Sequence, residues 1–165
     1  MLSAQLPPAK APKRGVPWDD VPEARRAVMR AIKSKDTKPE MAVRRLVHGM
    51  GYRYRLHRKD LPGKPDLAFG PCRKVIFVHG CFWHHHGVDG CRGARMPATR
   101  PEYWRAKLER NKERDERAIA RLGQLGWRAL TVWECQLRDM DKVTEQVLGF
   151  LGPRRTGQRR RLPFE

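Results

Sequence analysis

Residues 80–97 form a long segment that has neither helical nor strand periodicity and is rich in cysteine, histidine and aromatic side chains. A compact domain rarely contains so long a loop unless something else holds it in place. Cys81, His86 and Cys91, completed by Cys135 further along the chain, would form a four-ligand tetrahedral zinc site. Such a closed site would be structural and would fix the loop. The alternative is that Cys81 and Cys135 are small core residues and that Cys91 is incidental.

The chain is expected to keep its four cysteines reduced. Its first residues contain no apolar signal core, so we expect a cytoplasmic protein, in which disulfides are rare. No run of about 18 apolar residues occurs, so no segment is expected to span a membrane.

The charge of the 165-residue chain narrows the class of partner. Its 36 Lys and Arg residues exceed its 18 Asp and Glu residues, which gives a net charge of +18. Nucleic acid is the expected partner, because basic side chains release counterions from a phosphate backbone. Charge does not indicate chemistry: a DNA-coating protein would have the same composition, and a basic surface that only confers solubility is the alternative.

Composition divides the chain into three parts. Residues 1–19 and 152–165 are rich in proline and basic residues and are expected to be a flexible N-terminal arm and a C-terminal tail. Residues 20–151 are expected to form one domain.

Periodicity within this domain predicts an α/β architecture. Helices are expected over 22–33 (capped by Asp20), from a capping box at Thr37 to Gly51, from a second capping box at Thr99 to about 122, and over 141–151. Strands are expected over 52–56, 66–69, 74–79 and 127–133. The core order of helix, three strands, helix, strand and helix indicates a layered fold with a mixed sheet.

Two further groups of residues could carry chemistry. Asp66 opens one strand and His79 ends the next, so the two can meet where a carboxylate could hold Mg²⁺; the alternative is a turn aspartate and a strand-end histidine. Asn111 and Asp115 lie within an apolar stripe of the long helix, whose other members at helical spacing are Trp104, Leu108, Ile119 and Leu122. A buried Asp115 needs a partner, either a histidine or one of the many arginines.

Aromatic residues lie in and beside the 80–97 loop. Phe82 and Trp83 lie in the loop, and Trp104 lies in the first turn of the helix that follows. Exposed aromatic side chains of a basic protein can stack on bases or insert between them, although core packing is the more usual role of tryptophan.

Several of these stretches resemble the very-short-patch repair (Vsr) DNA mismatch endonucleases. They include Leu-Pro-Gly-Lys-Pro-Asp at 61–66 and Val-Ile-Phe-Val-His-Gly-Cys-Phe-Trp-His-His-His at 75–86. Shorter matches occur at 97–100, 102–104, 111, 113–115, 126–128 and 133–135, so the resemblance covers roughly residues 25–137. It implies a restriction-endonuclease-like fold of the PD-(D/E)xK type with an αβββαβ core, in agreement with the predicted order.

The resemblance also implies roles at the matching positions. Asp66 would ligate the catalytic Mg²⁺, and so would the backbone carbonyl of Val78, where family members often have threonine. His79 and Glu40 would hold waters bound to the metal. The remaining assignments are a His84–Asp115 dyad near the attacking water and a wedge of Phe82, Trp83 and Trp104 that enters the duplex beside the mismatch.

One departure from the family affects the zinc ligands. Residues 87–90 separate the histidine run from Cys91, whereas close relatives have this cysteine soon after the histidines. We therefore assign His86 as the ligand with His85 as its alternative, and we assign no role to Cys72.

The implied reaction is Mg²⁺-dependent hydrolysis of one phosphodiester, 5′ to the T of a T:G mismatch, as arises when 5-methylcytosine deaminates. The alternatives are a related restriction-type nuclease with another target and a zinc-stabilised DNA-binding module without catalysis. We expect a monomer associated with the bacterial nucleoid, with a DNA cytosine methyltransferase and mismatch-repair proteins as further partners.

Overall fold

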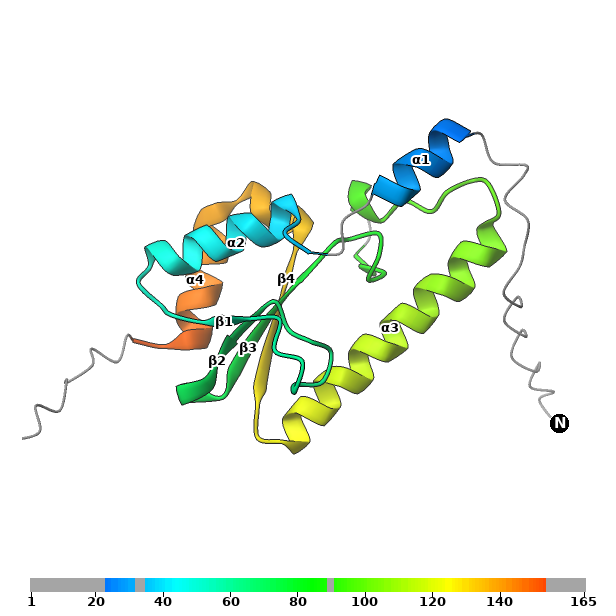
Figure 1. Ribbon diagram of the computed structural model, residues 1–165. Helices are drawn as coiled ribbons and strands as arrows, with labels where there is room; N and C mark the ends of the chain where they lie inside the picture. The colour runs from blue at the N-terminus through cyan, green and yellow to red at the C-terminus, as the bar shows by residue number, and fades with distance from the viewer. Residues whose placement is uncertain (1–22, 32–34, 89–90, 154–165) are drawn as a thin grey trace, which may run out of the picture.

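The computed structural model describes residues 23–31, 35–88 and 91–153 (Figure 1). The expected arm at 1–19, the cap at Asp20 and nearly all of the expected tail lie outside the described residues. The helices are α1 (Glu23–Ala31), α2 (Lys38–Gly49), α3 (Pro101–Gln124) and α4 (Met140–Leu151). The strands are β1 (Arg55–Leu56), β2 (Leu67–Phe69), β3 (Lys74–His79) and β4 (Arg128–Trp133).

The four strands form one sheet in the order β1-β2-β3-β4. The pairs β1–β2 and β2–β3 are antiparallel, whereas β4 runs parallel to β3 from the Lys74–Arg128 pair to the His79–Trp133 pair. A parallel pair needs a crossover, and α3 supplies it. The order α2, β1, β2, β3, α3, β4 is the expected αβββαβ core with a mixed sheet, so the prediction of a restriction-endonuclease-like α/β fold is confirmed.

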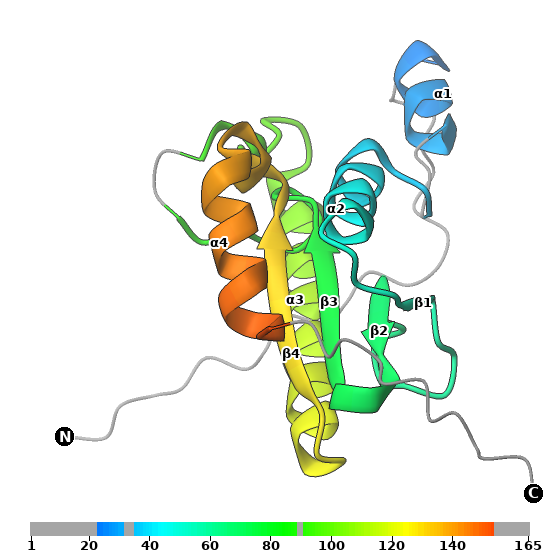
Figure 2. The same ribbon diagram turned by 90° about the vertical axis from the view of Figure 1, so that its left-hand side faces the viewer.

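Helices cover both faces of this sheet. Helices α2 and α4 lie on one face and α3 runs along the other (Figure 2). Nine buried residues fill the first interface: Val43, Val47, Leu67, Phe69, Ile76, Val132, Val143, Val147 and Leu151. Those of the second interface are Leu61, Ala68, Val75, Phe77 and Leu122. Alternate residues of β3 enter opposite cores, because successive side chains of a strand point to opposite faces.

The starts of the two predicted capping-box helices differ. Thr37 caps α2 as predicted, and Glu40 completes the reciprocal pair of hydrogen bonds. The box at Thr99 is wrong: α3 begins at Pro101, and its N-cap is Arg100, with a left-handed φ of 53° and no side-chain cap. Pro101 has no N–H to cap and a φ suited to the first helical turn, so this helix can begin without a capping side chain.

The first strand is shorter than the five residues predicted. Only Arg55 and Leu56 pair with β2. Tyr52 and Tyr54 instead pack edge-on against Phe69, with ring centroids 6.4 and 6.0 Å apart. Their hydroxyls donate hydrogen bonds to backbone carbonyls outside the sheet, and this packing fixes the segment without ladder bonds. Among the described helices, none has the length and apolarity needed to cross a membrane.

Candidate active site and metal centre

Asp66 lies at the start of β2, beside the end of β3. Its carboxylate accepts a hydrogen bond of 2.7 Å from the backbone N–H of Val78. The pKa of Asp66 is raised to about 6: burial is the largest cause and the negative charge of Glu40 adds to it, while the Val78 hydrogen bond and the charges of His57 and Arg44 oppose both. A cation in this position would remove the cost of the buried charge, so the residues fit a divalent metal with oxygen ligands.

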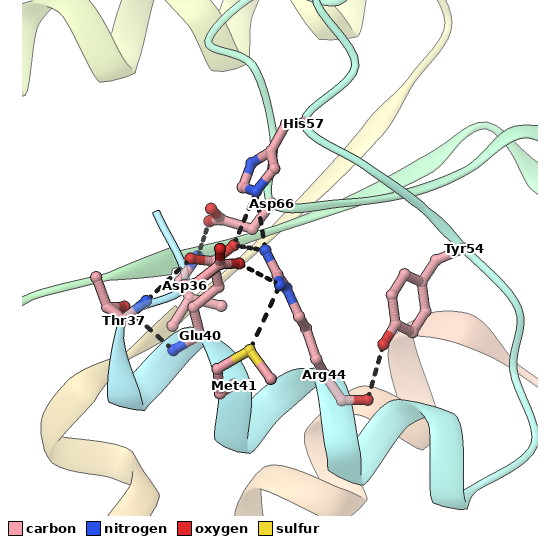
Figure 3. A network of polar contacts seen from close by, with 9 residues as sticks. Asp36, Thr37, Glu40, Met41, Arg44, Tyr54, His57 and Asp66 are labelled. Atoms are coloured by element: carbon pink, nitrogen blue, oxygen red, sulfur yellow. Dashed lines mark hydrogen bonds and ion pairs between the residues drawn. The ribbon is translucent and has the colours of Figure 1, made fainter. Parts of the chain in front are cut away.

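Glu40 faces the same region from α2 and belongs to a polar network (Figure 3). Its side chain is almost wholly buried. One carboxylate oxygen accepts from the Thr37 N–H at 3.4 Å as part of the capping box. The other accepts from the Arg44 guanidinium and lies 3.3 Å from Nε2 of His57. Capping and ion pairing therefore fix Glu40 from two sides.

Two histidines meet at the end of β3. The rings of His79 and His84 stack with centroids 3.7 Å apart and planes inclined by only 9°. Nδ1 of His84 lies 2.6 Å from the Asp115 carboxylate, which Arg114 also binds. Burial lowers the pKa of His79 to about 3, and the adjacent His84 contributes. Burial alone would raise the pKa of Asp115, but the His84 hydrogen bond and the Arg114 charge outweigh it and lower that pKa.

The predicted zinc ligands come together from two segments. The sulfur atoms of Cys81, Cys91 and Cys135 and a ring nitrogen of His86 all lie within 4.8 Å of one another. Nδ1 of His86 is 3.6 Å from the Cys135 sulfur. Tetrahedral zinc with ordinary bond lengths separates a sulfur and a nitrogen ligand by about 3.6 Å, so this donor set fits zinc. His85, the alternative, is not part of the cluster and has a left-handed φ of 51°.

The predicted wedge residues form one aromatic cluster. Phe82 lies edge-on to Trp83 and Trp104, with ring centroids 5.0 and 5.1 Å away. Lys107 places its ammonium 5.4 Å from the Trp83 ring and 5.3 Å from the Trp104 ring. Trp104 is only 6% exposed, whereas Phe82 and Trp83 are half-buried. Trp104 therefore also packs as a core residue.

Sequence reasoning missed some members of the site. Arg44 and His57 contact Glu40, and Asn111 donates a 2.9 Å hydrogen bond to the Trp83 carbonyl. The position of Asn111 within an apolar stripe indicated a buried partner but did not identify it. Nothing in the sequence separates Arg44 from the other basic residues, because its burial depends on packing against the segment that follows β1.

Comparison with known proteins shows the family. A family model described as DNA mismatch endonuclease Vsr matches residues 19–90. The type II nicking enzyme V.XorIIP of Xanthomonas oryzae pv. oryzae is 50% identical over 132 residues, which are 80% of this chain and 95% of that relative. The DNA mismatch endonuclease Vsr of Escherichia coli is 48% identical over 120 residues, which are 73% of this chain and 75% of that relative.

One solved structure is also similar. The catalytic domain of the homing endonuclease I-Bth0305I matches with a TM-score of 0.48 and 23% identity, over 70% of this chain and 94% of that domain, a similarity too low to bear on function. The family model and the identity to the two relatives show the family without this solved structure. The chain belongs to the Vsr family of DNA endonucleases.

Proposed function

We propose that this endonuclease nicks one strand of duplex DNA 5′ to the T of a T:G mismatch, in a reaction that requires Mg²⁺. The observation that carries the proposal is the convergence of four elements at one end of β3. Asp66 is hydrogen-bonded to Val78, and the His84–Asp115 pair stacks on His79. Family membership supports DNA as the substrate and a mismatch as the feature recognised.

The His84–Asp115 pair is proposed to handle the proton of the attacking water. Asp115 holds a hydrogen on Nδ1 of His84, which leaves Nε2 free to accept one. The water oxygen forms a bond to phosphorus and its proton passes to Nε2 of His84, while the bond to the 3′ oxygen breaks and that oxygen takes a proton from solvent. The products are a 3′ hydroxyl and a 5′ phosphate. The low pKa of His79 keeps that ring neutral, so it does not repel a proton on the stacked His84.

Asp66 and the backbone carbonyl of Val78 are the proposed ligands of Mg²⁺, and His79 and Glu40 are proposed to orient water molecules nearby. When bound there, Mg²⁺ would polarise the phosphodiester and stabilise the developing negative charge. Asp66 also orders the end of β3, because its carboxylate binds the N–H of the residue whose carbonyl is the second proposed ligand.

A structural Zn²⁺ is proposed at Cys81, His86, Cys91 and Cys135, which are joined across the loop and the segment after β4. Burial and the neighbouring thiols raise the pKa of Cys81 to about 12, so this thiol would ionise at neutral pH only with a cation beside it. The loop that this zinc would fix carries His84 and the aromatic residues Phe82 and Trp83. These two and Trp104 are the proposed wedge at the mismatch.

Nicking of a panel of labelled duplexes tests the proposal. The panel contains T:G, the other mismatches and matched pairs in several flanking contexts, each with Mg²⁺ or with EDTA. We expect a nick 5′ to the T of T:G only with Mg²⁺, and none from Asp66→Asn. Cleavage of matched duplexes would instead indicate a restriction-type activity, and binding without any nicking would indicate a DNA-binding module. The expected monomer, methyltransferase and repair partners remain predictions.

A further inference from the structure

Arg44 is buried although arginine is usually exposed. The residue is 7% exposed, whereas Arg45, its neighbour on α2, lies on the surface. Its guanidinium binds Asp36 at 2.6 Å and Glu40 from one turn earlier in the helix. A buried guanidinium persists only where carboxylates and hydrogen-bond acceptors replace its water. Here the carboxylates of Asp36 and Glu40 replace the water of its two terminal nitrogens.

Glu40 depends on Arg44 for its orientation. The capping box occupies one carboxylate oxygen of Glu40 and leaves the other free to accept a hydrogen bond from a side chain. Arg44 binds that second oxygen, so the carboxylate plane is fixed by contacts at both ends. A planar guanidinium fork fixes geometry in a way that a single ammonium does not.

Residues on either side of β1 hold Arg44 in turn. Nε2 of His57 lies 2.8 Å from the guanidinium, and the Tyr54 hydroxyl donates a 3.0 Å hydrogen bond to the Arg44 carbonyl. Nε2 of His57 has two neighbours, Arg44 at 2.8 Å and the Glu40 carboxylate at 3.3 Å. Arginine has no lone pair to offer, so the shorter contact makes Nε2 the acceptor and places the ring hydrogen on Nδ1. His57 also has a φ of 45°, a left-handed conformation uncommon for histidine. The backbone therefore has an unusual conformation at His57, the residue whose side chain contacts Arg44.

We propose that Arg44 and His57 are positioning residues of the active site: Arg44 orients the Glu40 side chain toward the site at Asp66, and His57 orients Arg44. This inference rests on the proposed nuclease function of that site. Neither residue touches the reacting atoms, so their effect is transmitted through Glu40. Loss of residues that orient the groups around a metal typically costs roughly 10- to 100-fold in activity or metal affinity.

Matched substitutions test the role of Arg44 in nicking. We expect Arg44→Gln to lower kcat on a T:G duplex roughly 10- to 100-fold with little change in KM, and Arg44→Lys to recover part of this loss because it restores the charge without the fork. Arg45→Gln, on the exposed side of the same helix, should retain the kcat of the wild type. A kcat for Arg44→Gln equal to that of Arg45→Gln would overturn the role of Arg44.

His57→Ala keeps the inference testable if Arg44→Gln does not fold, because the His57 side chain is 23% exposed and outside the core. Its kcat should fall while that of His48→Ala, an exposed histidine on α2, does not. Wild-type kcat in both His57→Ala and Arg44→Lys would overturn the inference. A fall in the control variants equal to that in the Arg44 and His57 variants would also overturn it.

The histidine tautomer provides a readout that needs no activity. Long-range ¹H–¹⁵N spectra of the metal-free protein at pH 8 should show His57 with its hydrogen on Nδ1, and Arg44→Gln should remove this preference. A hydrogen on Nε2 in the wild type would overturn the inference whatever the nicking results. If the wild type nicks no duplex but shows the expected tautomer, the proposed function has failed while the contact between Arg44 and His57 stands.

Discussion

Replacing Asp66 with asparagine should make the metal-free protein more stable while abolishing nicking. Asp66 has a pKa of about 6 in the folded protein, above its ordinary value of 3.8. The folded state therefore binds this proton more tightly than the unfolded state does, so ionisation destabilises the fold as pH rises from 3.8 through 6. Above pH 6 the full penalty is present, and it disappears below about pH 4, where both states are protonated.

The size of the expected stabilisation follows from the shift in the pKa of Asp66. A rise of about two pKa units corresponds to about 3 kcal/mol of unfolding free energy, at 1.36 kcal/mol per unit. Asparagine carries no charge, and its carbonyl oxygen can still accept the hydrogen bond from Val78. For a domain of this size, 3 kcal/mol raises the melting temperature by roughly 6–12 °C. This value is a ceiling, because the variant must also bury an amide NH₂ group.

Thermal melts without added Mg²⁺ at pH 4 and pH 8 measure this effect. Asp66→Asn should melt above the wild type at pH 8 and close to it at pH 4. Adding Mg²⁺ should raise the melting temperature of the wild type, since a ligand that binds only the folded state stabilises it, but should leave Asp66→Asn unchanged. A variant that melts at or below the wild type at pH 8 would refute the argument that the buried, ionised carboxylate of Asp66 destabilises the fold when no cation is bound.

Four further predictions address other parts of the site. Asp115→Asn should lower kcat by roughly 10²–10⁴ with duplex binding retained, because His84 loses the carboxylate that fixes its tautomer; an equal loss of binding would contradict this role. Cys135→Ser should release the zinc and lower the melting temperature, and elemental analysis that still finds one zinc per chain would show that the ligand was misassigned. Trp83→Ala should reduce nicking at the mismatch far more than overall binding, which depends on the basic surface, and a parallel fall in both would remove it from recognition. Trp104→Ala should in addition cost about 3–5 kcal/mol of stability because the side chain is buried, and an unchanged melting temperature would contradict that burial.

Local periodicity was sufficient for most of the fold. The Thr37 capping box, the six-residue strand β3 and helix α4 before Gly152 lie within one or two residues of where the sequence predicted them. Each depends on residues close together in the chain, namely a capping pair, an apolar run or a glycine with a positive φ. The start of α3 was mispredicted because the conformation of its N-cap depends on the path of the preceding loop, and a local sequence pattern does not contain that path.

The stripe along α3 illustrates the same limit. Helical spacing predicted one face from Trp104 to Leu122, and both of these ends are buried. Ile119 lies on that face in the sequence pattern but is 39% exposed, because the neighbouring elements do not cover every turn of so long a helix. Periodicity identifies which face is apolar, and only packing decides how much of it is covered.

The sequence by itself determined which residues could do chemistry at this site. Cysteines and histidines in a loop without secondary structure, and an aspartate within an apolar stripe, require partners wherever they lie. Only the tertiary structure decided which partners meet: it placed Cys135 beside His86, Asp115 beside His84, and Asp66 against the backbone of Val78. These pairs are separated in sequence by 49, 31 and 12 residues, so their distances follow from the crossover and the sheet register rather than from any local pattern.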